Sequence, residues 1–368
     1  MIVNSNGPYV SFLLTVALLC VFVVGCDSSG SSGGEASVDR VAVTGTEVSP
    51  NFQSDGKFGV SATPLDGGGN GIISNNLSAS VKIEHNPASS TKAHTDSIVA
   101  EVDIDSTNEA SGNDLAIPIV LDGSGSMGSN DRQRLRVDGA KAFIDALDSG
   151  SAPFESAVFE FPGFSSNPDF ANTDVFAGFT NDIDSLKNGI EQAEAFGGTP
   201  MYSSLAEVLI YSEDERPNAN YQKAIVLLAD GRPNYSQTLR DSVCTDAQRK
   251  NSPIFGIGLG PASDLSDNRD GDAIARMRDI SSCSGGAYQG LSPDSLEAVE
   301  EAFTSAAAGS SQGSVNFGVE IVSGLSELKA GDIIRGTLTV ESGGTSADGV
   351  FTFRVPDAAT SSSKSFQY

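Results

Sequence analysis

The sequence has 368 residues, with 48 Asp and Glu against 22 Lys and Arg and a formal net charge of −26. This length exceeds one average domain, so it predicts two compact units or one large domain with flanking strands. The acidic balance argues against nucleic acid as a partner, because phosphate binding needs clustered basic residues. We interpret the acidity as a soluble, self-repelling surface.

The N-terminal residues have the character of an export segment. Residues 1–25 carry no charged side chain and are largely apolar, which predicts a signal segment outside the fold. Val23-Val24-Gly25-Cys26 resembles a bacterial lipobox, in which the cysteine is acylated and becomes the mature N-terminus. Residues 26–40 are rich in Gly and Ser, which is typical of a flexible tether.

The resemblance to a lipobox implies a protein that is anchored in a membrane through a lipid on Cys26. It would then lie outside the cytoplasm, in a bacterial periplasm or at the cell surface. The Lys or Arg that usually precedes the apolar stretch is absent. A plain transmembrane anchor and ordinary secretion therefore remain alternatives.

Residues 41–110 form a β-rich flank. Short alternating runs separated by turn residues predict strands at 41–44, 58–62, 79–83 and 98–102, as in part of a β-sandwich. We interpret His85 and His94, which fall in this flank, as exposed polar positions.

The strand pattern returns at the C-terminal end, in residues 312–368. It predicts strands at 315–322, 333–340 and 350–355. These strands resemble those of residues 41–110. The two flanks could therefore complete one sandwich into which the central residues are inserted, an arrangement that the sequence permits but does not prove.

Residues 115–308 show apolar runs that alternate with helical stretches. This pattern predicts an α/β fold with a doubly wound, mostly parallel sheet. The expected strands are 115–121, 157–161, 224–229 and 254–259. The expected helices are 131–147, one spanning Ile183 to Ala193, one opened by Thr199-Pro200, and one that begins at Ser292-Pro293.

Three loops of this central region should converge at one edge of the sheet. Strand 115–121 runs into Asp122-Gly-Ser124-Gly-Ser126, and open parallel sheets bind ligands at such carboxyl ends. The loops at Thr199 and Asp230 should reach the same place. Their oxygen-bearing side chains suit Mg²⁺ or Mn²⁺, which prefer octahedral oxygen ligands.

Taken singly, the Asp-x-Ser-x-Ser loop could be no more than an Asx-turn that caps a helix. The presence of all three loops, in order, favours the metal. Because the hydroxyls are neutral, two carboxylates barely cancel the charge of a divalent cation. The metal would then attract an acidic group of a partner.

The same segments resemble the von Willebrand factor type A family, including integrin inserted domains. The resemblance rests on Val120-Leu-Asp-Gly-Ser-Gly-Ser-Met127, Gly198-Thr199-Pro-Met-Tyr and Leu228-Ala-Asp230-Gly, and it covers about residues 115–308. It implies a Rossmann-like fold with a complete metal ion-dependent adhesion site.

In that site, the resemblance implies that Ser124 and Ser126 ligate the metal directly. Asp122, Thr199 and Asp230 would ligate it directly or through water. An Asp or Glu of the partner would fill the open position. Gly123 departs from the family pattern, in which Thr is common, but this position gives the metal no side chain.

The cysteines indicate one further feature. Cys20 and Cys26 belong to the export segment, which leaves Cys244 and Cys283 as an even pair in an exported domain. Such a pair forms a disulfide or stays as two buried thiols. Residues 281–288 also resemble the last strand region of bacterial family members, including tight-adherence pilus components. The resemblance implies that Cys244 pairs with Cys283.

Enzymatic function finds little support in the motifs. The sequence lacks a Gly-x-x-x-x-Gly-Lys phosphate loop, a His-Glu-x-x-His helix and a Gly-x-Ser-x-Gly elbow, and no His base is near Ser124 in sequence. Ser266 to Gly271 is interpreted as a solvated turn, because a calcium loop would need an acid at its twelfth position.

We therefore predict a non-enzymatic, membrane-anchored binding or adhesion protein. It would take a protein ligand with an exposed Asp or Glu, with no nucleic acid and no small-molecule substrate. A scaffold or assembly subunit of an envelope or pilus machine is the main alternative. A metal-assisted hydrolase is a weaker one.

Overall fold

The computed structural model describes residues 36–49, 51–68, 70–73, 76–86, 98–109, 114–149, 153–163, 171–216, 221–230, 233, 236–291 and 296–356. The expected signal segment, the lipidation site Cys26, most of the tether and His94 lie outside these residues. Within the described part of the chain, no helix is both long and apolar enough to cross a membrane.

A mostly parallel sheet lies at the centre of the α/β region. Its order is β11-β10-β9-β5-β6-β7, with β8 paired to β5, and only β6 and β7 pair antiparallel. The strands are β5 (Asp114–Asp122), β6 (Phe154–Phe161), β7 (Asp174–Thr180), β8 (Tyr221–Lys223), β9 (Ile225–Ala229), β10 (Ile254–Gly258) and β11 (Tyr288–Gly290).

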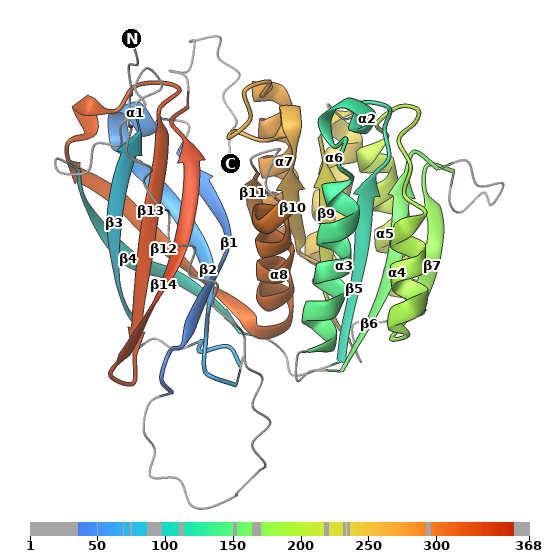
Figure 1. The fold of residues 1–368 in the computed structure, drawn as a ribbon, viewed down its shortest axis with the longest axis horizontal. Coiled ribbons are helices and arrows are strands. Elements are labelled where there is room, and N and C mark those ends of the chain that lie inside the picture. The colour runs from blue at the N-terminus through green and yellow to red at the C-terminus, as the bar shows by residue number, and fades with distance from the viewer. Residues whose placement is uncertain are drawn as a thin grey trace, which may run out of the picture. The chain divides into compact units, whose positions relative to one another are not determined.

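Helices cover both faces of this sheet (Figure 1). Side chains alternate along β5, so Ile119 and Leu121 pack on one face and Val120 packs on the other. One face carries α3 (Leu135–Asp148), α4 (Ile183–Glu191) and α8 (Leu296–Gln312); the other carries α5 (Met201–Glu215), α6 (Gln237–Arg249) and α7 (Gly271–Ser284). The predicted doubly wound α/β fold is confirmed.

Two predicted helix starts were wrong. The helix expected from Asp131 is α3, which begins four residues later at Leu135, and a short helix that was not predicted, α2 (Met127–Asn130), precedes it. The Asp131 carboxylate accepts the backbone N–H groups of Leu135 and Arg136, so this residue caps the helix from outside. Likewise α5 begins at Met201, and Pro200 rather than Thr199 occupies the capping position.

Several elements had no counterpart among the predictions, and the longest of them are β7, α6 and α7. The last two are joined by a disulfide between Cys244 and Cys283, whose Cα atoms are 5.5 Å apart. This bond closes a loop with a sequence separation of 39 residues. A closed loop of this size restricts the unfolded chain and so stabilises the fold.

The strands on either side of the α/β region form two antiparallel sheets. Their orders are β1-β2-β12-β4 and β14-β13-β3, so each sheet combines strands that precede and follow that region. An apolar cluster that includes Phe58, Phe317 and Phe353 draws on both sheets. The strands are β1 (Arg40–Val48), β2 (Lys57–Leu65), β3 (Ser78–Asn86), β4 (Val99–Glu109), β12 (Gly313–Ser323), β13 (Ile333–Ser342) and β14 (Thr345–Arg354).

His85 is not the exposed polar residue that we expected. It is only 5% exposed, and its Nε2 lies 2.7 Å from Oδ2 of Asp332. On β3, His85 is two positions beyond the buried Ile83, so both side chains point to the same inner face. Its polar group is satisfied there by a buried partner, as buried polar groups require.

Candidate metal centre

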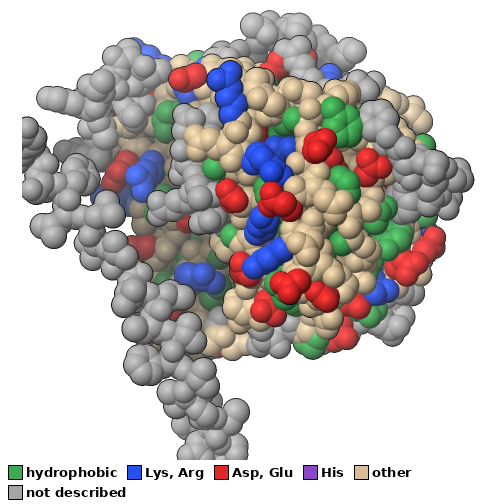
Figure 2. All heavy atoms as spheres, turned by 45° about the vertical axis from the view of Figure 1, so that its right-hand side comes forward, with side chains coloured by type: hydrophobic (Ala, Val, Ile, Leu, Met, Phe, Trp, Pro, Cys, Tyr) green, Lys and Arg blue, Asp and Glu red, His purple; other side chains and the backbone are tan. Residues whose placement is uncertain are grey.

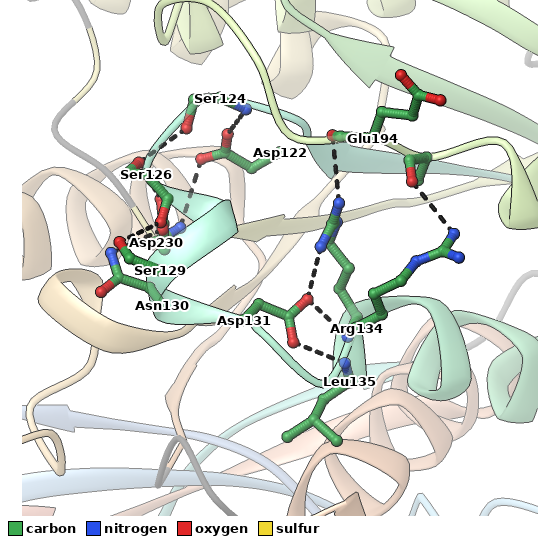
Figure 3. A network of polar contacts seen from close by, with 12 residues as sticks. Asp122, Ser124, Ser126, Ser129, Asn130, Asp131, Arg134, Leu135, Glu194 and Asp230 are labelled. Atoms are coloured by element: carbon green, nitrogen blue, oxygen red, sulfur yellow. Dashed lines mark hydrogen bonds and ion pairs between the residues drawn. The ribbon is translucent and has the colours of Figure 1, made fainter.

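The carboxyl edge of the central sheet brings four of the five predicted ligands together (Figure 3). Asp122 is the last residue of β5, and Ser124 and Ser126 follow it in the loop before α2. Asp230 follows β9. Because β5 and β9 pair in parallel, with Leu121 opposite Leu228, both strands deliver their carboxylates to one place.

Hydrogen bonds link these four residues in a ring. Asp122 accepts the N–H of Ser124 at 2.7 Å and the N–H of Asp230 at 3.4 Å. The hydroxyls of Ser124 and Ser126 are 3.0 Å apart, and the Ser126 hydroxyl donates to Oδ1 of Asp230 at 2.9 Å. Asp122, Ser124 and Asp230 are buried, whereas Ser126 is exposed. The candidate site is therefore accessible to solvent on the side of Ser126.

Thr199, the fifth predicted ligand, is half-buried and makes no hydrogen bond with the other four among the described residues. The loop that carries it nevertheless lies against the serine loop. The Gly125 N–H donates to the Gly197 carbonyl at 3.1 Å, and the Phe196 N–H donates to the Gly123 carbonyl at 2.6 Å. Thr199 follows two residues after this contact.

Both carboxylates are in an unfavourable electrostatic environment. Burial, and then the neighbouring charge of Asp230, raise the pKa of Asp122 above its ordinary value. Burial also raises the pKa of Asp230, although hydrogen bonds from Asn130 and Ser126 oppose this. A cation between the two carboxylates would offset this cost, so the residues present fit a bound metal.

Hydrogen bonds hold the oxygens of the site at distances that neighbouring ligands of a small cation also have. Neighbouring oxygens on an octahedral Mg²⁺ lie about 2.9 Å apart, because each metal–oxygen bond is about 2.05 Å. The Ser124–Ser126 and Ser126–Asp230 oxygens are 3.0 and 2.9 Å apart. No group of three or more His, Cys, Asp or Glu in the described ranges could hold a metal. The candidate site instead offers serine hydroxyls and two carboxylates, and oxygen ligands of this kind suit a small, hard cation.

Asn130 is a site residue that the sequence did not reveal. Its Nδ2 donates to Oδ2 of Asp230 at 2.9 Å, and its Oδ1 accepts from Asn268 at 3.1 Å. It thereby holds the second oxygen of Asp230 while Ser126 holds the first. The contact joins residues 100 positions apart, so no local pattern could have indicated it.

Glu160, near the end of β6, is a second residue that we missed. It is fully buried, and its Oε1 accepts the Glu194 N–H at 2.9 Å. Its Oε2 has no hydrogen-bond partner within the described residues. Burial raises the pKa of Glu160 to about 8. The signal was visible, because Glu160 interrupts the apolar run from Ala157 to Phe161.

Glu160 also explains the departure at Gly123. A Cβ atom built on Gly123 would lie 2.5 Å from Cδ and 2.6 Å from Oε1 of Glu160. Both distances are far below van der Waals contact. The glycine therefore leaves the space that the buried glutamate side chain occupies.

Replacing Glu160 with Gln should make stability less sensitive to alkaline pH. Because the folded pKa of about 8 exceeds the ordinary value of 4.5, wild-type stability falls as pH rises between these values. Gln keeps an acceptor for the Glu194 N–H but does not ionise. In chelator, we expect Glu160→Gln to match wild type at acid pH and to exceed it by about 5 kcal/mol above the folded pKa.

Urea denaturation at pH values of about 4 and 9, on either side of this transition, measures the effect. The exposed Glu194, changed to Gln, is the matched control, since it removes one carboxylate from the same neighbourhood. If the free energy of unfolding depends on pH in the same way for wild type and Glu160→Gln, ionisation of Glu160 does not destabilise the folded state as proposed.

Comparisons with known proteins identify the family of the α/β region. The von Willebrand factor type A domain model matches residues 116–305. No curated protein sequence matches the chain. One similar solved structure is a von Willebrand factor type A protein from Catenulispora acidiphila, with 14% identity, coverage of 90% of this chain and 76% of that chain, and a TM-score of 0.43.

Two further structures are similar in the same way. The vWF domain of the type V pili tip protein Mfa5 from Porphyromonas gingivalis has 14% identity, coverage of 53% of this chain and 94% of its own, and a TM-score of 0.39. The manganese-loaded TRAP protein from Plasmodium vivax has 15% identity, coverage of 71% and 98%, and a TM-score of 0.39. At such identities a likeness concerns the fold alone. The family model, however, covers more than half of the sequence, and this chain therefore belongs to the von Willebrand factor type A family.

Proposed function

We propose that this protein is a metal-dependent binding module that holds an Asp or Glu of a protein partner through Mg²⁺ or Mn²⁺. The ligands would be Asp122, Ser124, Ser126, Thr199 and Asp230. The observation that carries the proposal is that two buried carboxylates, Asp122 and Asp230, meet the hydroxyls of Ser124 and Ser126 at one edge of the sheet. Carboxylate and hydroxyl oxygens are the ligands that a small, hard cation prefers.

Each residue has a distinct part in this proposal. Asp122 and Asp230 supply charge, and their hydrogen bonds to backbone and to Asn130 fix their orientation. Ser124 and Ser126 supply neutral oxygens. A divalent cation held in this way keeps enough positive charge to attract a carboxylate. Ser126, on the exposed side of the site, marks where that carboxylate would enter.

We assign binding to this site, not catalysis. The sequence contains two histidines, of which His85 pairs with Asp332 on the flanking sheets and His94 lies outside the described residues. No described imidazole therefore stands beside the serines to act as a general base. Turnover of a substrate by the purified chain would contradict this part of the proposal.

A peptide with one Glu in a neutral Gly/Ser background tests the proposal on the full chain. We expect saturable binding in Mg²⁺, and loss of binding in EDTA or when Gln replaces the Glu. If the chain binds Mg²⁺ but has the same affinity for the Glu and Gln peptides, the result would favour the alternative of a scaffold or assembly subunit, in which metal stabilises an interface. Absence of metal binding would overturn the proposal.

We also propose that Cys26 carries a lipid that holds the protein at a membrane outside the cytoplasm. The uncharged apolar residues 1–25, the Val-Val-Gly-Cys sequence and the Gly/Ser-rich residues after it support this. Cys26→Ser should remove incorporated acyl label and move the chain to the soluble fraction. Cys20→Ser, within the apolar run, is the control. Membrane retention of an unlabelled Cys26→Ser chain would indicate a transmembrane anchor instead.

A further inference from the structure

A pocket of about 460 Å³ lies beside the candidate metal centre. One wall consists of Met127, Gly128 and the residues that connect α2 to α3. The other consists of residues 191–195, which lead from α4 toward Thr199. Because Met127 directly follows Ser126, the pocket and the metal centre share one loop. A ligand at the metal therefore lies within reach of this pocket.

The pocket is lined by three arginines and, in equal number, by the acidic residues Asp131, Glu191 and Glu194. Arg132, Arg134 and Arg136 all line it, so three of the 22 basic residues occur within five positions. Arg136 is only 2% exposed; its Nη1 donates to Asp131 at 2.8 Å, and its Nη2 donates to the Glu194 carbonyl at 3.2 Å. Its Nε has no hydrogen-bond partner in the part of the chain that is described.

Arg134 is also held in place. It adopts a left-handed backbone conformation with φ of 56°, and its guanidinium donates to the Glu191 side chain at 3.0 Å and to the Glu191 carbonyl at 2.7 Å. Arg134 and Arg136 thus tie the loop before α3 to the opposite wall of the pocket. They give it a fixed shape before any ligand arrives.

Arg132 differs from both. It is exposed and makes no hydrogen bond or ion pair with another described residue. It also lines a second pocket, of about 440 Å³, on the other side of the same loop, together with Asn130 and Asn268. The Arg132 guanidinium is therefore a positive charge that lines both pockets next to the serine loop and remains available to a ligand.

Two of the three acidic residues of the pocket are already paired with basic groups other than Arg132, since Asp131 is paired with Arg136. Glu191 is paired with Arg134 and Lys141. The Glu194 carbonyl faces Arg136, but its carboxylate points away from the arginines (Figure 3). Figure 2, which views the side that carries α3 and α4, shows basic side chains in a row with acidic ones around them. With a net charge of −26, most of the surface repels an acidic partner, so an exposed guanidinium without a described partner, such as that of Arg132, offers a local point of attraction.

We propose that Arg132 binds a second acidic group of the same partner, beside the Asp or Glu that the metal takes. The partner's recognition element is then an acidic protein segment with two carboxylates, not a single exposed acid. This inference rests on the proposed function. Arg132 sets specificity because its contact with the second acid increases the affinity, while Arg134 and Arg136 hold in place the loop that carries Arg132.

Peptides with one Glu, and with two Glu separated by one to four neutral residues, test this on the full chain in Mg²⁺. The two acids then span about 7 to 17 Å in an extended peptide. We expect at least one two-acid peptide to bind about threefold to fivefold more tightly than the one-acid peptide, as for an exposed ion pair. Added salt should reduce the gain.

Arg132→Gln should abolish this gain and leave the affinity for the one-acid peptide within about twofold. Arg335→Gln is the matched control, because it removes one exposed guanidinium from β13, on the flanking sheets. It should retain the full gain.

Several outcomes would overturn the inference. One is that the gain in affinity from the second acid persists in Arg132→Gln. A second is that Arg335→Gln loses this gain equally. A third is that the one-acid peptide binds but no two-acid peptide binds more tightly at any spacing. Arg132-dependent binding of vesicles that contain anionic phospholipid, without any two-acid gain, would assign Arg132 to a membrane surface instead. If the one-acid peptide itself fails to bind in Mg²⁺, the proposed function fails, and this inference fails with it.

Discussion

Asp122→Asn is expected to abolish saturable Mg²⁺ and Mn²⁺ binding while the central sheet remains folded. Asp122 is fully buried at the end of β5 and is one of only two carboxylates in the candidate site. Asn keeps the shape and an acceptor for the Ser124 N–H, which Asp122 binds at 2.7 Å. The substitution removes the negative charge, and we therefore expect a loss of metal affinity of at least about 100-fold. This loss exceeds that caused by removing a residue that only hydrogen-bonds to a metal ligand.

The same change should not destabilise the metal-free protein. Burial and the charge of Asp230 make the ionised form of Asp122 costly, so neutralising it removes an unfavourable interaction. We expect the variant to equal or exceed wild type in urea midpoint when chelator is present. In wild type alone, metal should raise the midpoint, because a ligand that binds only the folded state stabilises it.

Calorimetric titration of the full chain, with circular dichroism as a check on folding, measures both effects. Asp214→Asn is the matched control, since Asp214 is an exposed carboxylate on α5. Undiminished metal binding in a folded Asp122→Asn chain would contradict the ligand set. A failure of wild type itself to bind metal would favour a metal-free scaffold.

The position of the site was predictable because it depends on local patterns and on a general property of parallel sheets. The apolar run at 115–121 became β5, whose side chains are buried on both faces. A strand of this kind must be central. Asp122 follows it and Asp230 follows another such strand, so the carboxyl edge brings them together.

The details around the site depend on contacts that sequence patterns do not encode. Asn130 acts on Asp230, and Glu160 occupies the space beside Gly123. Both contacts join separate strands and loops. The start of α3 was misjudged for a related reason: residues from Asp131 have helical propensity, yet the Asp131 side chain competes for the first backbone N–H groups.

His85 shows a failure of a different kind. Its period-two spacing from Ile83 indicates the inner face of β3, whereas the polarity of its imidazole favours an exposed position. A buried partner, Asp332, made the inner position acceptable, and it lies 247 residues away. The sequence left open whether the flanks share their sheets, because register between distant strands has no local signature.

Gly123→Thr, which introduces the residue common in the family, is expected to damage this protein. The new Cβ would lie 2.5 Å from Cδ of Glu160, so the buried carboxyl group must move and lose its bond from the Glu194 N–H. Overpacking and one lost buried hydrogen bond together should cost about 3 kcal/mol of stability.

Metal binding should weaken as well, by about tenfold or more, because Gly123 connects the loops of the site. Its N–H donates to the Phe161 carbonyl and its carbonyl accepts the Phe196 N–H, each at 2.6 Å. A displaced Gly123 therefore moves the segment that leads to Thr199. Urea denaturation and calorimetric titration of the variant measure the two losses.

A double-mutant cycle separates a steric cause from a backbone cause. Gly123 does not have a positive φ, so Thr meets no conformational barrier there, and the clash with Glu160 remains as the obstacle. In a Glu160→Ala background the Thr side chain should fill space that the glutamate vacates. We expect a favourable coupling of at least about 1.5 kcal/mol between the two changes, together with recovery of metal binding. Additive losses would show instead that Gly123 is required for the backbone of the loop itself. The difference from the family at this position would then be independent of Glu160.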